Sequence, residues 1–153
     1  MNYSLCAMNS FSCDHCHECV HESANWRSEM AVQNRNHCPF CLWSKHVDET
    51  VPGDRKSACV GLMVPIGLTI KRSRNKYAAT PTGELMLIHR CEKCEKININ
   101  RIAADDETNR ILDIFANSTS LDPYMKAELK KQKIRLLRKK DKLLVLTQVF
   151  GRK

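Results

Sequence analysis

The stretch Arg35-Asn36-His37-Cys38-Pro39-Phe40-Cys41 holds two cysteines separated by two residues, the spacing with which a chain clips a metal ion. Two more C-x-x-C pairs flank it, Cys13/Cys16 before and Cys91/Cys94 after. A single cysteine, Cys59, lies between the second and third pairs. Two thiolates of such a pair occupy one edge of a tetrahedral zinc ion. The pattern therefore predicts that metal binding organises the fold.

The nine cysteines among 153 residues require either disulfides or metal ions. The first twenty residues contain no long apolar run, and no stretch reaches the roughly 18 apolar residues of a membrane span. We therefore expect a cytoplasmic protein with no membrane partner, in which zinc binding is favoured over disulfides. No pattern for a small-molecule substrate is evident, and the sequence does not indicate an oligomeric state.

Seven cysteines, with His46 as the best candidate for the eighth ligand, are expected to bind two zinc ions per chain. The simplest pairing is sequential, with one site from Cys13, Cys16, Cys38 and Cys41 and a second from His46, Cys59, Cys91 and Cys94. A crossed pairing, in which Cys38/Cys41 join Cys91/Cys94, is the rival. A catalytic zinc keeps a position open for water, whereas eight ligands close two sites, so both sites are expected to be structural.

The other cysteines, the remaining histidines and Trp43 near the C-x-x-C pairs have expected roles other than metal binding. Cys19 extends the first pair to C-x-x-C-x-x-C and is interpreted as a spare thiol that could replace Cys13 or Cys16 as a ligand. Cys6 is expected to be a free, exposed thiol. The remaining histidines are expected to surround the sites or lie at the surface: His15, His17, His21, His37 and His89. Trp43 is interpreted as an aromatic core anchor, with base stacking as the alternative.

Zinc ribbons usually place glycine after the second cysteine of each pair, where the backbone favours positive φ. Here the corresponding residues are His17, Leu42 and Glu95. These knuckles are therefore expected to be slightly strained or differently turned.

The middle of the chain predicts two strands. Residues 60–70 alternate in a β-rich pattern, although Pro65 restricts this strand to an edge or a bulge. Residues 84–89 supply the returning strand. The connection forms a basic hairpin tip with four cationic side chains: Lys71, Arg72, Arg74 and Lys76.

After residue 100 the chain predicts helices. Asp105 or Asp106 can cap a short helix whose apolar face is Ile111, Leu112, Ile114 and Phe115, and residues 117–120 break it. Asp122 and Pro123 read as the N-cap and first residue of a second helix, which is expected to run at least to Lys140. Residues 143–150 could continue the helix or form a strand.

The formal charge of +8 is confined to one end of the chain. Residues 1–120 hold 14 basic and 14 acidic side chains, whereas residues 121–153 hold 11 basic and 3 acidic ones. A neutral body with a basic tail favours a polyanionic partner.

The chain resembles the RNHCP-domain family in several motifs: Phe11-x-Cys13-x-x-Cys16, Arg35-Asn36-His37-Cys38-Pro39, His46-Val47-Asp48, Pro52-Gly53-Asp54-Arg55, Cys59-x-Gly61-x-Met63-x-Pro65 and His89-Arg90-Cys91-x-x-Cys94. The resemblance covers roughly residues 11–106 and implies a small zinc-ribbon-like domain without indicating an activity. We thus predict a flexible N-terminus (1–10), a β-rich double zinc-binding domain (11–106) and a helical, basic C-terminal extension (107–153).

The preferred function is RNA binding, to ribosomal RNA, another structured RNA or a ribonucleoprotein. The predicted contacts are the hairpin tip, Arg35 and the basic helix residues Lys130, Lys131, Lys133, Arg135, Arg138, Lys139 and Lys140. One alternative is a protein-interaction adaptor that docks through the apolar residues among 136–150. A less favoured one is a zinc-dependent hydrolase or nuclease that uses His46, Asp48, Asp54 and Arg55, so no catalytic residue is assigned.

Overall fold

The structure is a computed structural model that describes residue 6 and residues 10–21, 35–51, 53–72 and 83–151. Its centre is an antiparallel four-stranded sheet in the order β3 (Ser44–Lys45), β4 (Leu62–Lys71), β5 (Glu84–Cys91) and β6 (Ile97–Arg101). A separate two-stranded hairpin comprises β1 (Ser10–Ser12) and β2 (Cys19–His21). The β-rich class and the two central strands are confirmed.

The long β4–β5 hairpin contains the irregularity expected at Pro65. Its register shifts between Pro65 and Gly67, because proline lacks the N–H that a regular ladder requires. At Gly67 an added Cβ would lie 2.5 Å from Cδ1 of Leu136, so glycine allows the C-terminal segment to approach the strand closely.

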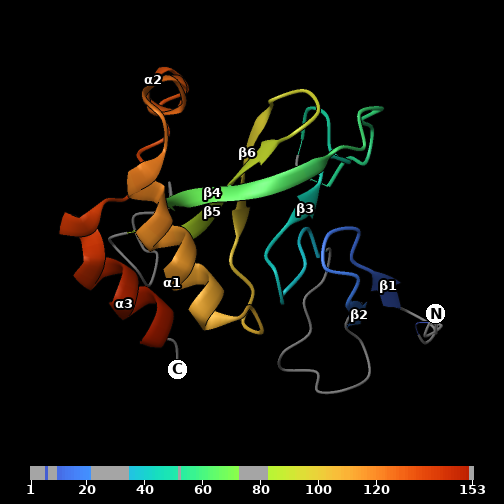
Figure 1. Ribbon diagram of the computed structural model, residues 1–153, viewed down its shortest axis with the longest axis horizontal. Helices are drawn as coiled ribbons and strands as arrows, with labels where there is room; N and C mark the ends of the chain where they lie inside the picture. Colours follow the sequence, from blue (N-terminus) through green and yellow to red (C-terminus); the bar gives the residue numbers. More distant parts are fainter. Residues whose placement is uncertain (1–5, 7–9, 22–34, 52, 73–82, 152–153) are drawn as a thin grey trace.

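The C-terminal elements are α1 (Thr108–Asn117), η1 (Ser118–Ser120), α2 (Pro123–Lys131), η2 (Lys139–Asp141) and α3 (Lys142–Phe150). Figure 1 shows the three α-helices gathered at one end of β4 and β5, with the β1–β2 hairpin beyond the other end. α1 packs against β4, and α3 packs against β5. One core joins sheet and helices through buried residues that include Leu68, Leu87, Ile111, Phe115, Leu137 and Val145.

The predicted ends of the first helix need one correction. The N-cap of α1 is Glu107, whose carboxylate accepts from the N–H of Asn109, whereas Asp105 and Asp106 bind other groups. The cap at Asp122 is confirmed, since its carboxylate accepts from the N–H of Met125 at 2.8 Å. Residues 143–150, left open between helix and strand, belong to α3.

The second helix was expected to continue to Lys140, and this is wrong. α2 ends at Lys131, and Lys133 adopts a φ of +59° while the N–H of Ile134 donates to the carbonyl of Leu129. The chain then runs beside β4, where the N–H of Leu137 donates to Leu68 O at 2.9 Å and the Leu137 side chain is fully buried. Burial of this side chain against the sheet overrides the local helical preference.

Several parts of the chain lie outside the described residues: most of the predicted flexible N-terminus, residues 22–34, Arg74, Lys76 and the side chain of His21. Among the helices that the structure describes, none is both long enough and apolar enough to cross a membrane.

Candidate metal centres

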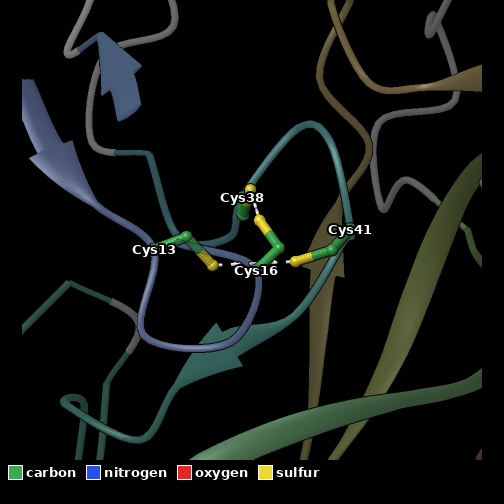
Figure 2. Close-up of side chains that lie close together, drawn as sticks. All are labelled: Cys13, Cys16, Cys38 and Cys41. Carbon is green, nitrogen blue, oxygen red and sulfur yellow. Dashed lines mark hydrogen bonds between the residues drawn. The ribbon is translucent and has the colours of Figure 1, made fainter. Parts of the chain in front are cut away.

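The first centre joins two knuckles that lie far apart in the sequence. Figure 2 shows the thiols of Cys13 and Cys16 facing those of Cys38 and Cys41. Sγ of Cys13 lies 3.6 Å from Sγ of Cys41, and Sγ of Cys16 lies 3.7 Å from Sγ of Cys38. The β1–β2 hairpin is thereby held against the turn that precedes β3.

The second centre lies at the end of the main sheet. Nδ1 of His46 is 3.1 Å from Sγ of Cys94, and Sγ of Cys59 is 3.7 Å from Sγ of Cys91. His46 is held in place by backbone hydrogen bonds, since its N–H donates to Gly61 O and its carbonyl accepts from Val60 N. Cys91 is the last residue of β5, so the sheet itself positions this ligand.

The eight residues thus form the sequential groups, and the crossed pairing is contradicted. In each group the four candidate ligand atoms lie within 4.8 Å of one another. Metal–sulfur bonds of about 2.3 Å in a tetrahedron place neighbouring sulfurs about 3.8 Å apart. The sulfur pairs at 3.6 and 3.7 Å fit that edge, so both groups could hold a zinc ion.

The three knuckles share one backbone turn. The residues after the second cysteines, His17, Leu42 and Glu95, have φ values of 63°, 63° and 66°, and the N–H of each donates to the carbonyl of the first cysteine in its pair. Of the two expected alternatives, slightly strained or differently turned knuckles, the first is confirmed and the second is wrong. The left-handed conformation of a residue with a side chain costs about 1 kcal/mol, which metal binding can offset.

Hydrogen bonds favour the thiolate form at one ligand of each centre. The Cys41 thiol donates to Cys38 and lowers the pKa of Cys38 to about 5, while it raises the pKa of Cys41. Burial raises the pKa of Cys91, but the backbone N–H groups of Cys94 and Lys93 outweigh it and lower this pKa to about 7. Thiolate is the form that binds a metal ion.

The loop between His46 and Cys59 is held together by two carboxylates. Asp54 accepts from the N–H groups of Glu49, Thr50, Val51 and Lys56, and Asp48 accepts from those of Gly53 and Arg55. The N–H groups of Val51, Glu49 and Thr50 hold the pKa of Asp54 well below its usual range. Both carboxylates therefore serve the turn that brings His46 and Cys59 together.

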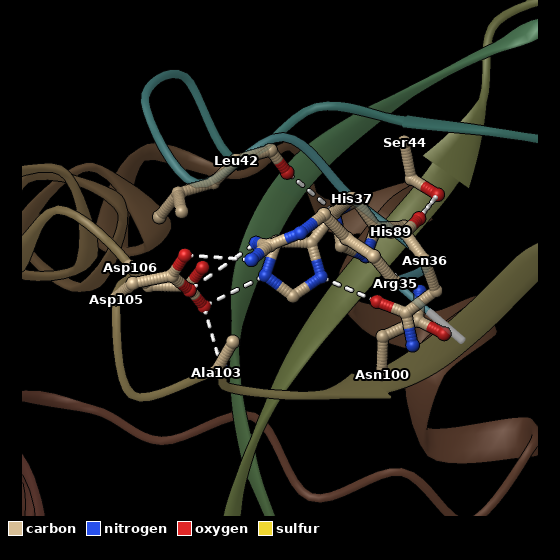
Figure 3. Close-up of polar contacts among 10 residues, drawn as sticks. All are labelled: Arg35, Asn36, His37, Leu42, Ser44, His89, Asn100, Ala103, Asp105 and Asp106. Atoms are coloured by element: carbon tan, nitrogen blue, oxygen red, sulfur yellow. Dashed lines mark hydrogen bonds and ion pairs between the residues drawn. The ribbon is translucent and has the colours of Figure 1, made fainter. Parts of the chain in front are cut away.

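The residues before the second knuckle form a polar network with the turn that precedes α1 (Figure 3). The guanidinium of Arg35 binds both carboxylate oxygens of Asp105, at 3.2 and 2.6 Å. Nε2 of His37 lies 2.7 Å from Asp106, and its Nδ1 contacts the Asn36 side chain. The Arg35 side chain is only 4% exposed, which corrects its assignment to a nucleic-acid surface.

His89 connects the same knuckle to the sheet. Its ring is fully buried, Nε2 donates to Leu42 O at 2.7 Å, and Nδ1 accepts from the Asn100 amide at 2.9 Å. Burial lowers the pKa of His89 to about 3, so the ring stays neutral near pH 7. The expectation that His37 and His89 surround the centres rather than bind metal agrees with these contacts.

The N-terminal disulfide differs from expectation, and Trp43 contacts one of the histidines near the first centre. Cys6 and Cys19 form a disulfide, so Cys6 is not a free thiol and Cys19 is not a spare one. The ring of His15 stacks on Trp43 with centroids 3.9 Å apart, and Trp43 is half-buried. Trp43 therefore packs beside the first centre.

Most of the predicted basic contacts are exposed. The exposed side chains are Lys71, Arg72, Lys130, Lys131, Lys133, Arg135, Arg138, Lys139 and Lys140. Lys71 and Arg72 lie at the end of β4. Lys131 lies 3.9 Å from Glu128, and Arg135 binds Asp141.

Lys126 was missed by the sequence analysis. It lines two cavities together with several predicted cations, and its position four residues before Lys130 on a helix was an available signal. The Asn36–His37–Asp106 network was also missed, because Asp106 lies 69 residues from His37 and no spacing rule joins them.

The comparison with curated proteins found no match, and neither did the comparison with solved structures. A family model described as the RNHCP domain matches residues 8–112, which include all eight candidate metal ligands. The chain therefore belongs to the RNHCP-domain family.

Proposed function

We propose that this protein binds two structural zinc ions and uses the rigid body that they stabilise to present a basic surface to structured RNA. The observation that carries the RNA assignment is the segregation of charge: the whole formal excess of +8 lies in residues 121–153. Most of these cations are exposed, and the segment that bears them is anchored in the core by Leu129, Leu137 and Val145.

The donor chemistry supports zinc. Seven thiols and one imidazole suit a borderline-soft ion that prefers four tetrahedral ligands, whereas magnesium and calcium prefer oxygen. The residues that would hold the ions are the two groups described above, and the ions would supply folding free energy rather than chemistry. This assignment is also consistent with the position of Cys91 at the end of a core strand.

The geometry gives little support to a zinc-dependent hydrolase or nuclease. Asp48 and Asp54 already accept backbone hydrogen bonds in their own loop, and His46 points Nδ1 into the second centre. Four ligands at each centre leave no position for an activated water.

A protein-interaction adaptor is the second candidate, because α3 exposes large apolar side chains. Leu143 is 78% exposed and Phe150 is 64% exposed. Exposed apolar residues that cluster on one surface commonly mark a contact with another protein.

The test combines metal analysis with RNA crosslinking. Mass spectrometry of the purified native protein should give two zinc ions per chain, and ultraviolet crosslinking in cells should recover RNA. A double variant, Leu143→Ala with Phe150→Ala, should retain RNA crosslinking. Recovery of a protein partner that depends on these two residues, without RNA, would instead support the adaptor.

A further inference from the structure

The end of α2, the segment that follows it and η2 surround a basic hollow, which we call the basic groove. It consists of two cavities, of about 620 and 540 Å³, that share Lys126, Leu136, Arg138 and Lys140. The groove exists because α2 stops at Lys131: a helix continuing to Lys140 would place these side chains around a cylinder instead of facing a common hollow.

The lining of the groove is cationic. Seven of the described lining residues are basic: Lys126, Lys130, Lys133, Arg135, Arg138, Lys139 and Lys140. No acidic residue is found among the described residues that line either cavity. Within the part of the chain that the structure describes, the side chains of Lys130, Lys133, Arg138 and Lys140 form no ion pair with an acidic residue, so their charges are available to a polyanion.

The wall of the groove is fixed before any ligand binds. Asp141 is buried, accepts from the backbone N–H of Arg138 at 2.8 Å and pairs with the guanidinium of Arg135. The N–H of Leu137 donates to Leu68 O, which ties the same segment to β4. Because the backbone is already ordered, binding would require the ordering of side chains alone.

The groove lacks a surface on which a base can stack. The apolar part of the lining is aliphatic and includes Leu129, Ile134, Leu136 and Leu137, and none of the described residues that line either cavity is aromatic. Proteins that bind single strands without sequence preference use aromatic side chains as stacking platforms, whereas duplex RNA is recognised through its phosphates and 2′-hydroxyls.

We propose that the basic groove binds the sugar–phosphate backbone of an RNA duplex stem. This inference rests on the proposed function and specifies its ligand and its site. It predicts that duplex RNA binds more tightly than single-stranded RNA of the same sequence, and that affinity falls steeply with salt.

The experiment compares three full-length, zinc-loaded proteins by fluorescence anisotropy. The groove variant carries Lys130→Gln, Lys133→Gln and Arg138→Gln. The control carries Lys56→Gln, Arg110→Gln and Lys142→Gln, three exposed cations outside the groove, so that both lose the same charge. The probes are an RNA hairpin stem and an unstructured RNA of equal length, each titrated at several salt concentrations. Zinc content and thermal midpoint establish that both variants fold.

The wild-type protein and the control should prefer the hairpin. For the groove variant, the negative slope of log affinity against log salt should become shallower by about 3, because each of the three substituted cations would otherwise neutralise one phosphate. Equal decreases in affinity for the groove variant and the control would overturn the groove as the site.

A further variant tests whether the protein instead binds single-stranded RNA by stacking bases on an exposed aromatic side chain. Tyr124 is 67% exposed on α2 and does not line the groove. Tyr124→Ala should leave hairpin affinity unchanged. A preference for the unstructured RNA that disappears in Tyr124→Ala would overturn duplex binding while keeping RNA as the partner. If the wild-type protein binds neither RNA, the proposed function fails and this inference fails with it.

Discussion

Gly61 lies where the second metal centre leaves no room for a side chain. A Cβ at this position would be 2.8 Å from Cβ of Lys93 and 2.9 Å from Sγ of Cys91. Gly61→Ala should therefore displace Cys91 and reduce the zinc content from two ions to one per chain, as measured by mass spectrometry. The neighbouring backbone hydrogen bonds of His46 should weaken with it.

Gly53 provides the matched control for Gly61. It has a φ of +89°, but a Cβ there would meet nothing within 4 Å. Gly53→Ala should cost about 1 kcal/mol of backbone strain while both zinc ions remain bound. Two zinc ions in Gly61→Ala would contradict the steric argument.

His89 should make folding stability depend on pH. Its pKa is about 3 in the folded protein, against about 6.5 for an exposed histidine. Below pH 6.5 the histidine binds a proton in the unfolded chain but not in the folded one. Its contribution to the free energy of unfolding is therefore complete above pH 6.5 and is lost as the pH falls towards 3.

The measurement is the free energy of unfolding of zinc-saturated protein at pH 6.5 and pH 5. Between these values the wild-type protein should lose about 2 kcal/mol more than His89→Gln, in which glutamine can retain both hydrogen bonds. Protonation of the metal ligands affects both proteins alike and cancels in the comparison. An identical pH dependence would exclude a buried neutral His89.

At the scale of the elements, the segment between α2 and η2 joins the basic extension to the sheet. Leu137 is fully buried in the core shared by the sheet and the helices, whereas Leu143 at the start of α3 is 78% exposed. Leu137→Ala should lower the free energy of unfolding by about 2–5 kcal/mol, because it leaves a cavity.

Leu143→Ala should change the free energy of unfolding by less than about 0.5 kcal/mol. Denaturant titrations of both variants test the pair. Equal stabilities would mean that the extension does not contribute to the core as the structure indicates.

For the whole molecule, the two metal centres should differ in their effect on folding. The first centre holds the small β1–β2 hairpin, around which Cys13, Val20 and Cys38 form a separate minor core. The second centre includes Cys91, which ends the central strand β5. Loss of the first centre should therefore destabilise only the β1–β2 hairpin, whereas loss of the second should destabilise the four-stranded sheet.

The double variants Cys13→Ser/Cys16→Ser and Cys59→Ser/Cys91→Ser test this difference. The first should retain one zinc ion and a cooperative thermal transition. The second should lose the cooperative transition, because the free energy of zinc binding is folding free energy in small domains. Circular dichroism on heating measures both; cooperative unfolding of the second variant would contradict the assignment.

The metal framework could be predicted because it depends on local chemistry. The C-x-x-C spacing brings two thiols together within a single turn, so the paired ligands could be identified from the sequence. The choice of the sequential over the crossed grouping needed the tertiary structure, because it depends on which distant pairs meet. The β4–β5 hairpin and the cap at Asp122 were likewise predictable, since strand alternation and capping are properties of short segments.

The end of α2 and the basic groove were decided by the tertiary structure. Residues 132–140 have a helical composition, but the burial of Leu137 beside β4 and the close approach of Leu136 to Gly67 favour an extended path. The same holds for Arg35, whose partner Asp105 lies 70 residues away. Contacts between distant segments outweigh local propensities of a few tenths of a kcal/mol per residue, and short-range sequence patterns do not predict these contacts.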